Sequence, residues 1–178
     1  MDSGATYMDG TTDITRTYPL GELTEDEKRF YTWTLQSHID LAKAVWLDYC
    51  ECKMIDTIAR EPLWRHLINY RCGTGHSVSF VGNVHEGPHA LNSRNTTRMR
   101  PGMVVTDEPG VYETDLVGIR IENELVCVHK ADNQYGTFLG FEPLMFVPIA
   151  TSPILPGVLD KDEIAWLNDY HRSGVCKA

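Results

Sequence analysis

Four carboxylates and one imidazole are the side chains of this sequence whose chemistry suits a metal centre. They belong to Asp2, Asp13, Glu108, Glu122 and His76. Taken singly, each carboxylate is more typical of a turn or a surface position than of a metal ligand, and the histidine is more typical of ordinary core or surface packing. Taken together, an oxygen-rich set with one imidazole suits a hard or borderline divalent ion such as manganese, rather than zinc held by thiolates. The four negative charges would balance two divalent ions, so the sequence permits a dinuclear centre without establishing one.

Local sequence patterns favour a functional role for some of these residues. In the segment GIRIEN, Arg120 and Glu122 share one face of a predicted strand, so a guanidinium and a carboxylate would project into one polar site. Asp13 lies between β-branched residues in another strand pattern, where aspartate is disfavoured. His76 follows the sequence GTG, whose glycines let the backbone come close to whatever the imidazole contacts.

The elements that would position these side chains begin with a hairpin over residues 2–17, where alternating β-branched residues flank the polar turn DGTT. A helix is predicted over 24–46, with Thr24 and Glu27 forming a capping box and Trp46 ending an apolar stripe. A second helix is predicted over 53–67, where Pro62 would kink the helix or begin a new first turn.

Strands dominate the predicted second half of the chain. Short apolar runs predict strands at 103–106, 118–128 and 141–148, and the polar segment 88–100 is expected to be a surface loop. A last helix is predicted over 160–171, with Asp160 as its N-terminal cap. The order of a hairpin, two helices and mostly antiparallel strands predicts an α+β domain.

The composition argues against several classes of protein. With 178 residues, of which 42% are hydrophobic and 23% charged, the chain is expected to fold as one globular domain. A formal net charge of −9 without a basic stripe argues against nucleic acid as a partner. No apolar run approaches the ~20 residues that span a bilayer, and the N-terminus lacks the features of a secretion signal, so no membrane association is expected.

The cysteines are an odd number and show no paired metal spacing: Cys50, Cys52, Cys72, Cys127 and Cys176. The simplest interpretation is reduced thiols in a cytoplasmic protein.

The first strand pattern starts directly after Met1, with no preceding leader. We therefore expect Met1 to stand in front of an interior piece of a longer protein.

Five segments together resemble the aminopeptidase P (Xaa-Pro aminopeptidase) family of pita-bread metallopeptidases. In chain order they read DSGATYMDGTTDITRT, GTGHSVSFVGNVHEGP, TDEPGVYE, GIRIENELV and FEPLMFVPI. The resemblance covers nearly the whole chain, and NVHEGP with FEPL resembles the larger cytosolic-type enzymes more than prolidase or methionine aminopeptidase. It implies a pita-bread fold that is incomplete at its N-terminal side, with residues 1–178 forming the C-terminal part of the catalytic domain.

The resemblance also implies a role for each candidate metal ligand. Asp2 would bind one metal, His76 and Glu108 would bind the other, and Asp13 and Glu122 would bridge the two, with Mn²⁺ as the expected ion. In the family, a water or hydroxide between two manganese ions attacks the peptide carbonyl. The residue that matches Glu108 moves the proton to the leaving proline nitrogen, so Glu108 is expected to be catalytic as well.

Further residues acquire roles from the resemblance. His85, in NVHEGP, matches a catalytic histidine that contacts the substrate near the scissile carbonyl and stabilises the oxyanion. Arg120 would orient Asp2 or Glu122 from the second layer of contacts. Cys72 stands at a substrate-binding position where the family commonly has histidine, with CGTGH in place of HGTGH, and is expected to pack as a small hydrophobic side chain.

The activity implied by the resemblance is release of the N-terminal residue from peptides with proline in second position. The chain of 178 residues by itself is expected to be weakly active or inactive, because part of the substrate cleft would be missing. Apolar surface left uncovered would favour self-association or a homodimer. Two alternatives stay open: a non-catalytic pita-bread module that binds peptides or proteins, and a prolidase-type dipeptidase on the same scaffold.

Overall fold

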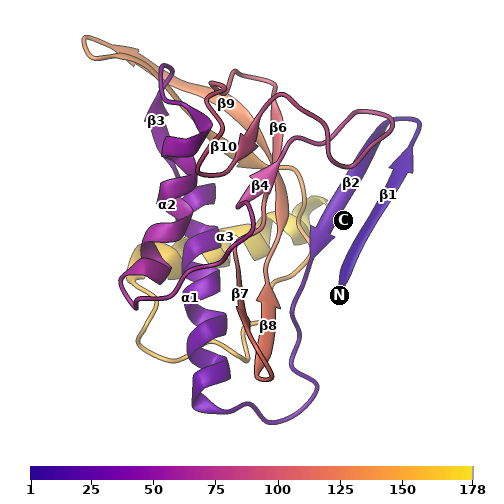
Figure 1. Cartoon of the computed structure of the whole chain (residues 1–178), viewed down its shortest axis with the longest axis vertical. Helices are drawn as coiled ribbons and strands as arrows, with labels where there is room; N and C mark the ends of the chain where they lie inside the picture. The colour runs from indigo at the N-terminus through magenta and orange to yellow at the C-terminus, as the bar shows by residue number, and fades with distance from the viewer. Residues whose placement is uncertain (178) are drawn as a thin grey trace.

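The fold is described by a computed structural model, which covers the backbone of residues 1–177 and the side chains of residues 1–175. The chain opens with the predicted hairpin, in which β1 (Asp2–Tyr7) pairs antiparallel with β2 (Gly10–Thr15). All six residues of β1 are exposed, and within the described residues only β2 pairs with this strand. The hairpin stands on the opposite side of the molecule from helices α1 and α2 (Figure 1).

Two helices follow the hairpin and pack against each other. In α1 (Glu25–Ala42), the Thr24 side chain accepts a hydrogen bond from the Glu27 amide and the Glu27 carboxylate accepts one from Thr24, so the predicted capping box is confirmed. The second helix, α2, comprises Cys52–Trp64 and contains Pro62 within it, so the proline does not begin a new helix.

A four-stranded antiparallel sheet forms the centre of the molecule (Figure 1). In spatial order its strands are β3 (Val45–Leu47), β10 (Gly136–Pro143), β9 (Asn123–Asn133) and β6 (Val104–Asp107). Two short antiparallel pairs accompany the sheet: β4 (Gly75–His76) with β5 (Ala90–Leu91), and β7 (Gly110–Glu113) with β8 (Val117–Arg120).

Several predicted boundaries are wrong, each because a tertiary contact decides where an element ends. The first helix stops at Ala42, since Trp46 belongs to β3, pairs with Leu139 and packs in the core. The predicted strand 118–128 is two strands, because the chain leaves its pairing with β7 after Arg120 and pairs with β6 from Asn123 onward. The predicted strand 141–148 is displaced, since β10 runs over 136–143 and residues 144–148 lie outside any strand.

The remaining predictions differ less from the structure. The polar segment 88–100 is largely irregular, but it contributes β5 and buries Leu91 and Met99 in the core. The last helix, α3, spans Lys161–Lys177, and the Asp160 carboxylate accepts hydrogen bonds from the amides of residues 162 and 163, so the predicted cap is confirmed. Among residues 1–177, no helix is both long and apolar enough to cross a bilayer.

Alternation along β9 separates two environments. Leu125 and Cys127 belong to the apolar core with residues of both preceding helices. Glu122 and Glu124, whose positions alternate with these, are buried but lie beside β2 and the hairpin. The sheet therefore has an apolar face toward α1 and α2 and an acidic region toward the hairpin.

Gly75 offers a direct test of how closely β4 approaches β6. A Cβ atom at this position would lie 1.8 Å from the Thr106 carbonyl oxygen, which neither backbone can accommodate without moving. We predict that Gly75→Ala lowers the free energy of unfolding by about 1–3 kcal/mol or more, as overpacking does. Urea denaturation would measure the change, with Gly21→Ala as the control because nothing lies within 4 Å of a Cβ atom there. Equal stability of the two variants would contradict the prediction.

Candidate metal centre

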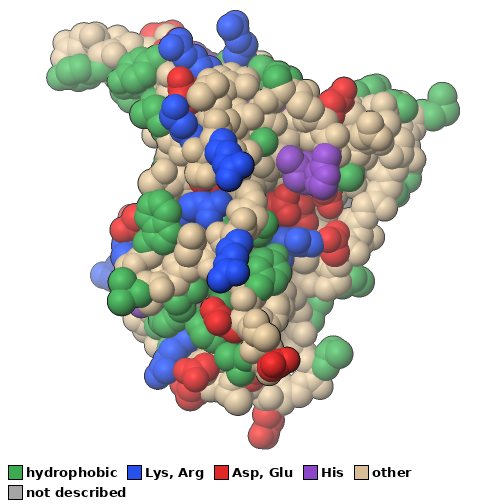
Figure 2. Space-filling model, viewed as in Figure 1, with side chains coloured by type: hydrophobic (Ala, Val, Ile, Leu, Met, Phe, Trp, Pro, Cys, Tyr) green, Lys and Arg blue, Asp and Glu red, His purple; other side chains and the backbone are tan. Residues whose placement is uncertain are grey.

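His76 lies at the centre of the acidic region. Its Nε2 atom is 3.4 Å from Asp13 Oδ2 and 3.1 Å from Glu108 Oε1. Ligand atoms of Asp13, His76 and Glu122 all lie within 4.8 Å of one another, close enough for one ion to contact all three. Figure 2 shows a histidine side chain next to acidic side chains on one face of the molecule, with a basic side chain beside them. The structure thus brings together residues of β2 and β4 with residues that directly follow β6 and precede β9.

A threonine on β6 connects His76 with Glu108. The Thr106 hydroxyl donates to Glu108 Oε1 at 2.9 Å and accepts from the His76 amide at 2.9 Å. The Glu108 amide donates to the Thr74 carbonyl at 2.8 Å, which fixes the backbone of the TDEP segment against the GTGH segment. Sequence reasoning missed Thr106, although its position two residues before Glu108 on a strand places both side chains on one face.

Glu122 is the most deeply buried of the candidate ligands, at 1% exposed. Its Oε2 atom accepts from the Thr15 hydroxyl at 2.5 Å, whereas Oε1 is buried and has no hydrogen-bond partner among the described residues. Burial raises the pKa of Glu122 to about 8, against the opposing effect of the Thr15 hydrogen bond. An unpartnered carboxylate oxygen at this depth is costly for the protein alone and fits a cation as its partner.

Arg120 contacts three of the predicted ligands: Asp2 and Glu108 directly, and Glu122 through a threonine. Its guanidinium forms an ion pair with Asp2, and its Nε donates to the Thr15 hydroxyl at 3.1 Å. The same hydroxyl donates to Glu122, so Arg120 reaches both carboxylates named for it in the sequence. Asp2 itself is half exposed and lies outside the group formed by Asp13, His76 and Glu122.

The two predicted substrate-contacting residues line different pockets. The imidazole of His85 meets that of His76 edge to face, with ring centroids 3.9 Å apart. Cys72 lines a separate pocket of about 460 Å³ together with Tyr112 and Arg120. Its thiol is free and exposed, so the expectation of a packed core side chain is wrong.

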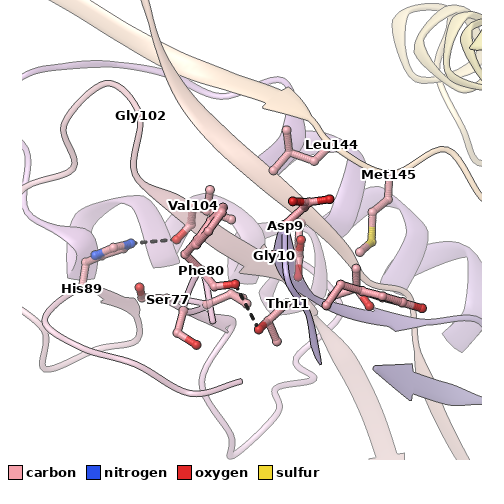
Figure 3. Close-up of a pocket in the computed structure, with 15 residues that line it drawn as sticks. Asp9, Gly10, Thr11, Ser77, Phe80, His89, Gly102, Val104, Leu144 and Met145 are labelled. Atoms are coloured by element: carbon pink, nitrogen blue, oxygen red, sulfur yellow. Dashed lines mark hydrogen bonds between the residues drawn. The ribbon is translucent and has the colours of Figure 1, made fainter. Parts of the chain in front are cut away.

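Two cavities flank the hairpin beside the candidate centre. One, of about 660 Å³, is lined by Asp2, Asp13 and His85 and therefore contains predicted site residues. The other, of about 730 Å³, is mainly apolar and is bounded by Phe80, Leu144 and the turn of the hairpin (Figure 3). Although the second cavity is larger, the first is the better candidate for a substrate because the chemistry lies in its wall.

Protonation of His76 is coupled to the carboxylates around it. Partial burial favours the neutral imidazole, but hydrogen bonds to Asp13 and Glu108 outweigh burial and raise the pKa of His76 to about 10. In the protein alone, the imidazolium therefore offsets part of the negative charge. A metal ion requires the neutral ring, so ion binding would release this proton.

Comparison with known proteins shows which family the chain belongs to. Residues 1–129 match metallopeptidase family M24, and residues 137–176 match the C-terminal region of peptidase M24. The chain belongs to metallopeptidase family M24. Among its M24 relatives, aminopeptidase P2 of Arabidopsis thaliana is 46% identical over 177 residues, which is 96% of this chain and 25% of the relative. Aminopeptidase P1 of Lotus japonicus is 43% identical over 96% of this chain and 26% of the relative.

Solved structures of the M24 family identify the fold. X-prolyl aminopeptidase from Caenorhabditis elegans, described as a cytosolic enzyme with a di-nuclear active site, matches with a TM-score of 0.93 and 39% identity. The match covers 99% of this chain and 29% of that one. Prolidase from Pyrococcus furiosus matches with a TM-score of 0.68 and 30% identity, over 80% of this chain and 39% of that one. The α+β pita-bread fold and the resemblance to aminopeptidase P are thereby confirmed, and the chain spans about a quarter of the length of its curated relatives.

The raised pKa of His76 predicts how the metal-free protein responds to pH. Because the folded-state pKa is raised, the stabilisation from these contacts is present below the ordinary pKa of 6.5 and is lost as the pH rises through about 10. NMR of ¹⁵N-labelled imidazole should show the His76 ring still protonated at about pH 8. Asp13→Asn should lower this pKa, and an unchanged titration in that variant would contradict the assigned cause.

Proposed function

We propose that residues 1–178 form the C-terminal part of the catalytic domain of a dinuclear manganese Xaa-Pro aminopeptidase. The observation that carries the proposal is the convergence of Asp13, His76, Glu108 and Glu122 in an M24 chain, with a buried Glu122 oxygen that has no hydrogen-bond partner in the described part of the chain. The names of the relatives and the match to the C-terminal region of peptidase M24 support it. The reaction is release of the first residue from peptides with proline in second position.

The proposed metal ligands are Asp2, Asp13, His76, Glu108 and Glu122. Their carboxylate and imidazole donors suit two divalent ions of the manganese type. Bound ions would supply Lewis acidity, lower the pKa of a water molecule and polarise the substrate carbonyl. The ion pair with Arg120 holds Asp2 in reach of the other ligands. The same guanidinium donates to the Thr15 hydroxyl, which in turn donates to Glu122 and orients its carboxylate.

Different residues of the chain are proposed to transfer the proton and to stabilise the developing negative charge. Glu108 is the proposed general base and then general acid, which takes a proton from water and gives it to the proline nitrogen. Thr106 holds its Oε1 atom, which also lies 3.1 Å from His76 Nε2. His85, whose ring contacts His76, is the proposed donor to the developing oxyanion. Cys72 lines the neighbouring pocket and would contact the substrate through a thiol where the family commonly has imidazole.

The proposed setting is a cytoplasmic enzyme whose partners are Xaa-Pro peptides, without nucleic acid or membrane. Because the chain spans about a quarter of its relatives, we propose full activity for the longest natural chain that carries this sequence and weak or no activity for residues 1–178 alone. Exposed apolar side chains near the hairpin, including Met8 and Phe80, would favour self-association or a homodimer of the shorter chain.

A prolidase-type dipeptidase is the second candidate function, favoured by the structural match to the Pyrococcus furiosus prolidase. A non-catalytic binding module is disfavoured, because all five proposed ligands are present in the sequence. Turnover of Xaa-Pro dipeptides compared with longer Xaa-Pro peptides separates the two enzymatic functions. Efficient hydrolysis of dipeptides alone would replace the aminopeptidase proposal with the prolidase one.

Metal binding tests the centre without measuring turnover. We predict that the full chain binds two Mn²⁺ ions by isothermal titration calorimetry. Glu122→Gln, which keeps the volume but removes the charge, should weaken binding by more than the ~10–100-fold typical of a residue that only supports a ligand. Glu142→Gln is the control, because that carboxylate lies exposed on β10. Equal binding by both variants would overturn the role of Glu122.

Glu108→Gln tests the proton step in the full chain. Glutamine can still offer an oxygen to a metal but cannot accept the proton, so kcat should fall by ~10²–10⁴-fold. Metal content measured on the same sample separates the two roles of the residue. An inactive variant with two ions supports proton transfer, and an inactive variant without ions makes Glu108 chiefly a ligand. A kcat within about fivefold of the parent would identify Glu108 as an ordinary turn residue.

A further inference from the structure

A buried polar network lies behind the candidate metal centre, on the side of the strands that faces helix α1. Its members are Arg16, His38, Asp107 and Asn123, each at most 2% exposed, with Tyr170 of α3 at one end. Three of them are close in sequence to candidate ligands, since Asp107 precedes Glu108, Asn123 follows Glu122, and Arg16 follows the segment that holds Asp13. The reaction proposed above uses none of these five residues.

The hydrogen bonds of this network have a fixed direction, which follows from Arg16. A guanidinium carries only donors, so the Asn123 atom that lies 2.8 Å from Arg16 Nη2 must be the amide oxygen. The Asn123 amide nitrogen then faces His38 and donates to Nε2 over 3.2 Å. Because Nε2 accepts, the imidazole carries its proton on Nδ1, which donates to the Asp107 carbonyl over 3.3 Å. The same atom lies 3.0 Å from Asp107 Oδ2, but neither carboxylate oxygen has a hydrogen-bond partner among the described residues.

The network joins the strands that carry the candidate ligands. Arg16 donates through Nη1 to the Thr15 carbonyl at 2.9 Å and to the Glu122 carbonyl at 2.5 Å, so it ties the end of β2 to the start of β9. Asn123 continues the link to His38 on α1, and His38 continues it to Asp107 at the end of β6. Each strand therefore presents a candidate ligand on one face and is anchored by a neighbouring residue on the other.

We propose that His38 is a positioning residue for the metal centre, through the chain of hydrogen bonds from Arg16 and Asn123 to Asp107. It fixes the placement of Glu108 relative to Glu122 and Asp13, so that the site is formed before an ion arrives. The inference rests on the proposed function, since it concerns the same metal centre. It adds a residue from a helix that contributes no candidate ligand.

Two substitutions of His38 divide its two hydrogen bonds. The amide of asparagine overlays the Nδ1 side of imidazole, so His38→Asn keeps a donor for Asp107 and loses the contact with Asn123. The amide of glutamine overlays the Nε2 side, so His38→Gln keeps the contact with Asn123 but removes the donor to the Asp107 carbonyl and the close contact with the buried Asp107 carboxylate. Because Asp107 adjoins Glu108, His38→Gln should disturb the centre more.

The control must share the helix and the burial of His38 without taking part in the hydrogen bonds of the network. Leu35→Ala meets this need, because Leu35 lies one turn earlier on α1, is fully buried and packs in an apolar cluster. Its cavity lowers stability by a route that does not involve hydrogen bonds. The thermal unfolding temperature of every variant is also measured, so that its loss of Mn²⁺ affinity can be compared with its loss of stability.

The experiment measures Mn²⁺ affinity of the full chain by calorimetry and the visible absorption spectrum of its Co²⁺ form, which reports ligand geometry. We expect His38→Gln to weaken Mn²⁺ binding about tenfold or more and to alter the Co²⁺ spectrum, as loss of a supporting contact does. His38→Asn should fall between His38→Gln and the parent, and Leu35→Ala should bind like the parent despite its lower thermal stability. This ordering supports the proposal.

Other outcomes overturn it in distinguishable ways. Parent-like affinity and spectrum in His38→Gln would overturn the positioning role, as would losses in Leu35→Ala that match those of the His38 variants. A parent chain that binds no Mn²⁺ would overturn the proposed function, and this inference with it. If neither His38 variant unfolds cooperatively, Tyr170→Phe decides, because it removes only a hydroxyl that accepts from Arg16 at 2.7 Å. A loss of about two- to fivefold in its affinity supports the network, and unchanged affinity overturns it.

Discussion

Repulsion among carboxylates is the constraint on which the rest of this structure depends. Asp13, Glu108 and Glu122 converge on His76, and Glu124 lies buried beside them with its pKa raised to about 7, chiefly by burial. Like charges at this separation cannot all remain ionised in a half-buried site without a cation. In the protein alone, the His76 imidazolium and the raised pKa of Glu122 relieve part of the repulsion. The same arrangement is what makes the site receptive to divalent ions.

A rigid support is needed to hold the acidic groups together against their repulsion. The strands provide this support because their successive side chains point to opposite faces. One face of β6 and of the start of β9 carries the acidic side chains, while the next residue on each strand points into the network beneath. Arg16 supplies a buried guanidinium to that network, and Asp107 supplies a carboxyl group whose pKa is raised by burial. Each member of the network hydrogen-bonds another member, which makes the network rigid, although the Asp107 carboxylate oxygens have no hydrogen-bond partner among the described residues. The buried network on one face of the strands thus supports the mutually repelling carboxylates on the other face.

Sequence reasoning predicted the parts of the site that depend on local pattern. The hairpin, the capping box at Thr24, the N-terminal cap at Asp160, and the shared face of Arg120 and Glu122 all follow from spacing within a few residues. It failed where distant packing decides, as at Trp46, whose place in the sheet ends α1 early. The roles of Thr15 and of His38 were also missed, because a threonine in a strand and a histidine in a helix look ordinary until their partners are known.

Gly75 in the GTGH segment was singled out from the sequence, but only part of the reason for a glycine there was predicted. The sequence suggested that Gly75 gives the backbone freedom near His76, but steric exclusion is the stronger reason, since a Cβ atom would meet the Thr106 carbonyl at 1.8 Å. That close approach lets the Thr106 hydroxyl accept from the His76 amide while it donates to Glu108. A glycine is therefore required so that one threonine can hold an imidazole and a carboxylate from different strands at 3.1 Å from each other. The lack of a side chain at Gly75 therefore helps to set the distance between His76 and Glu108.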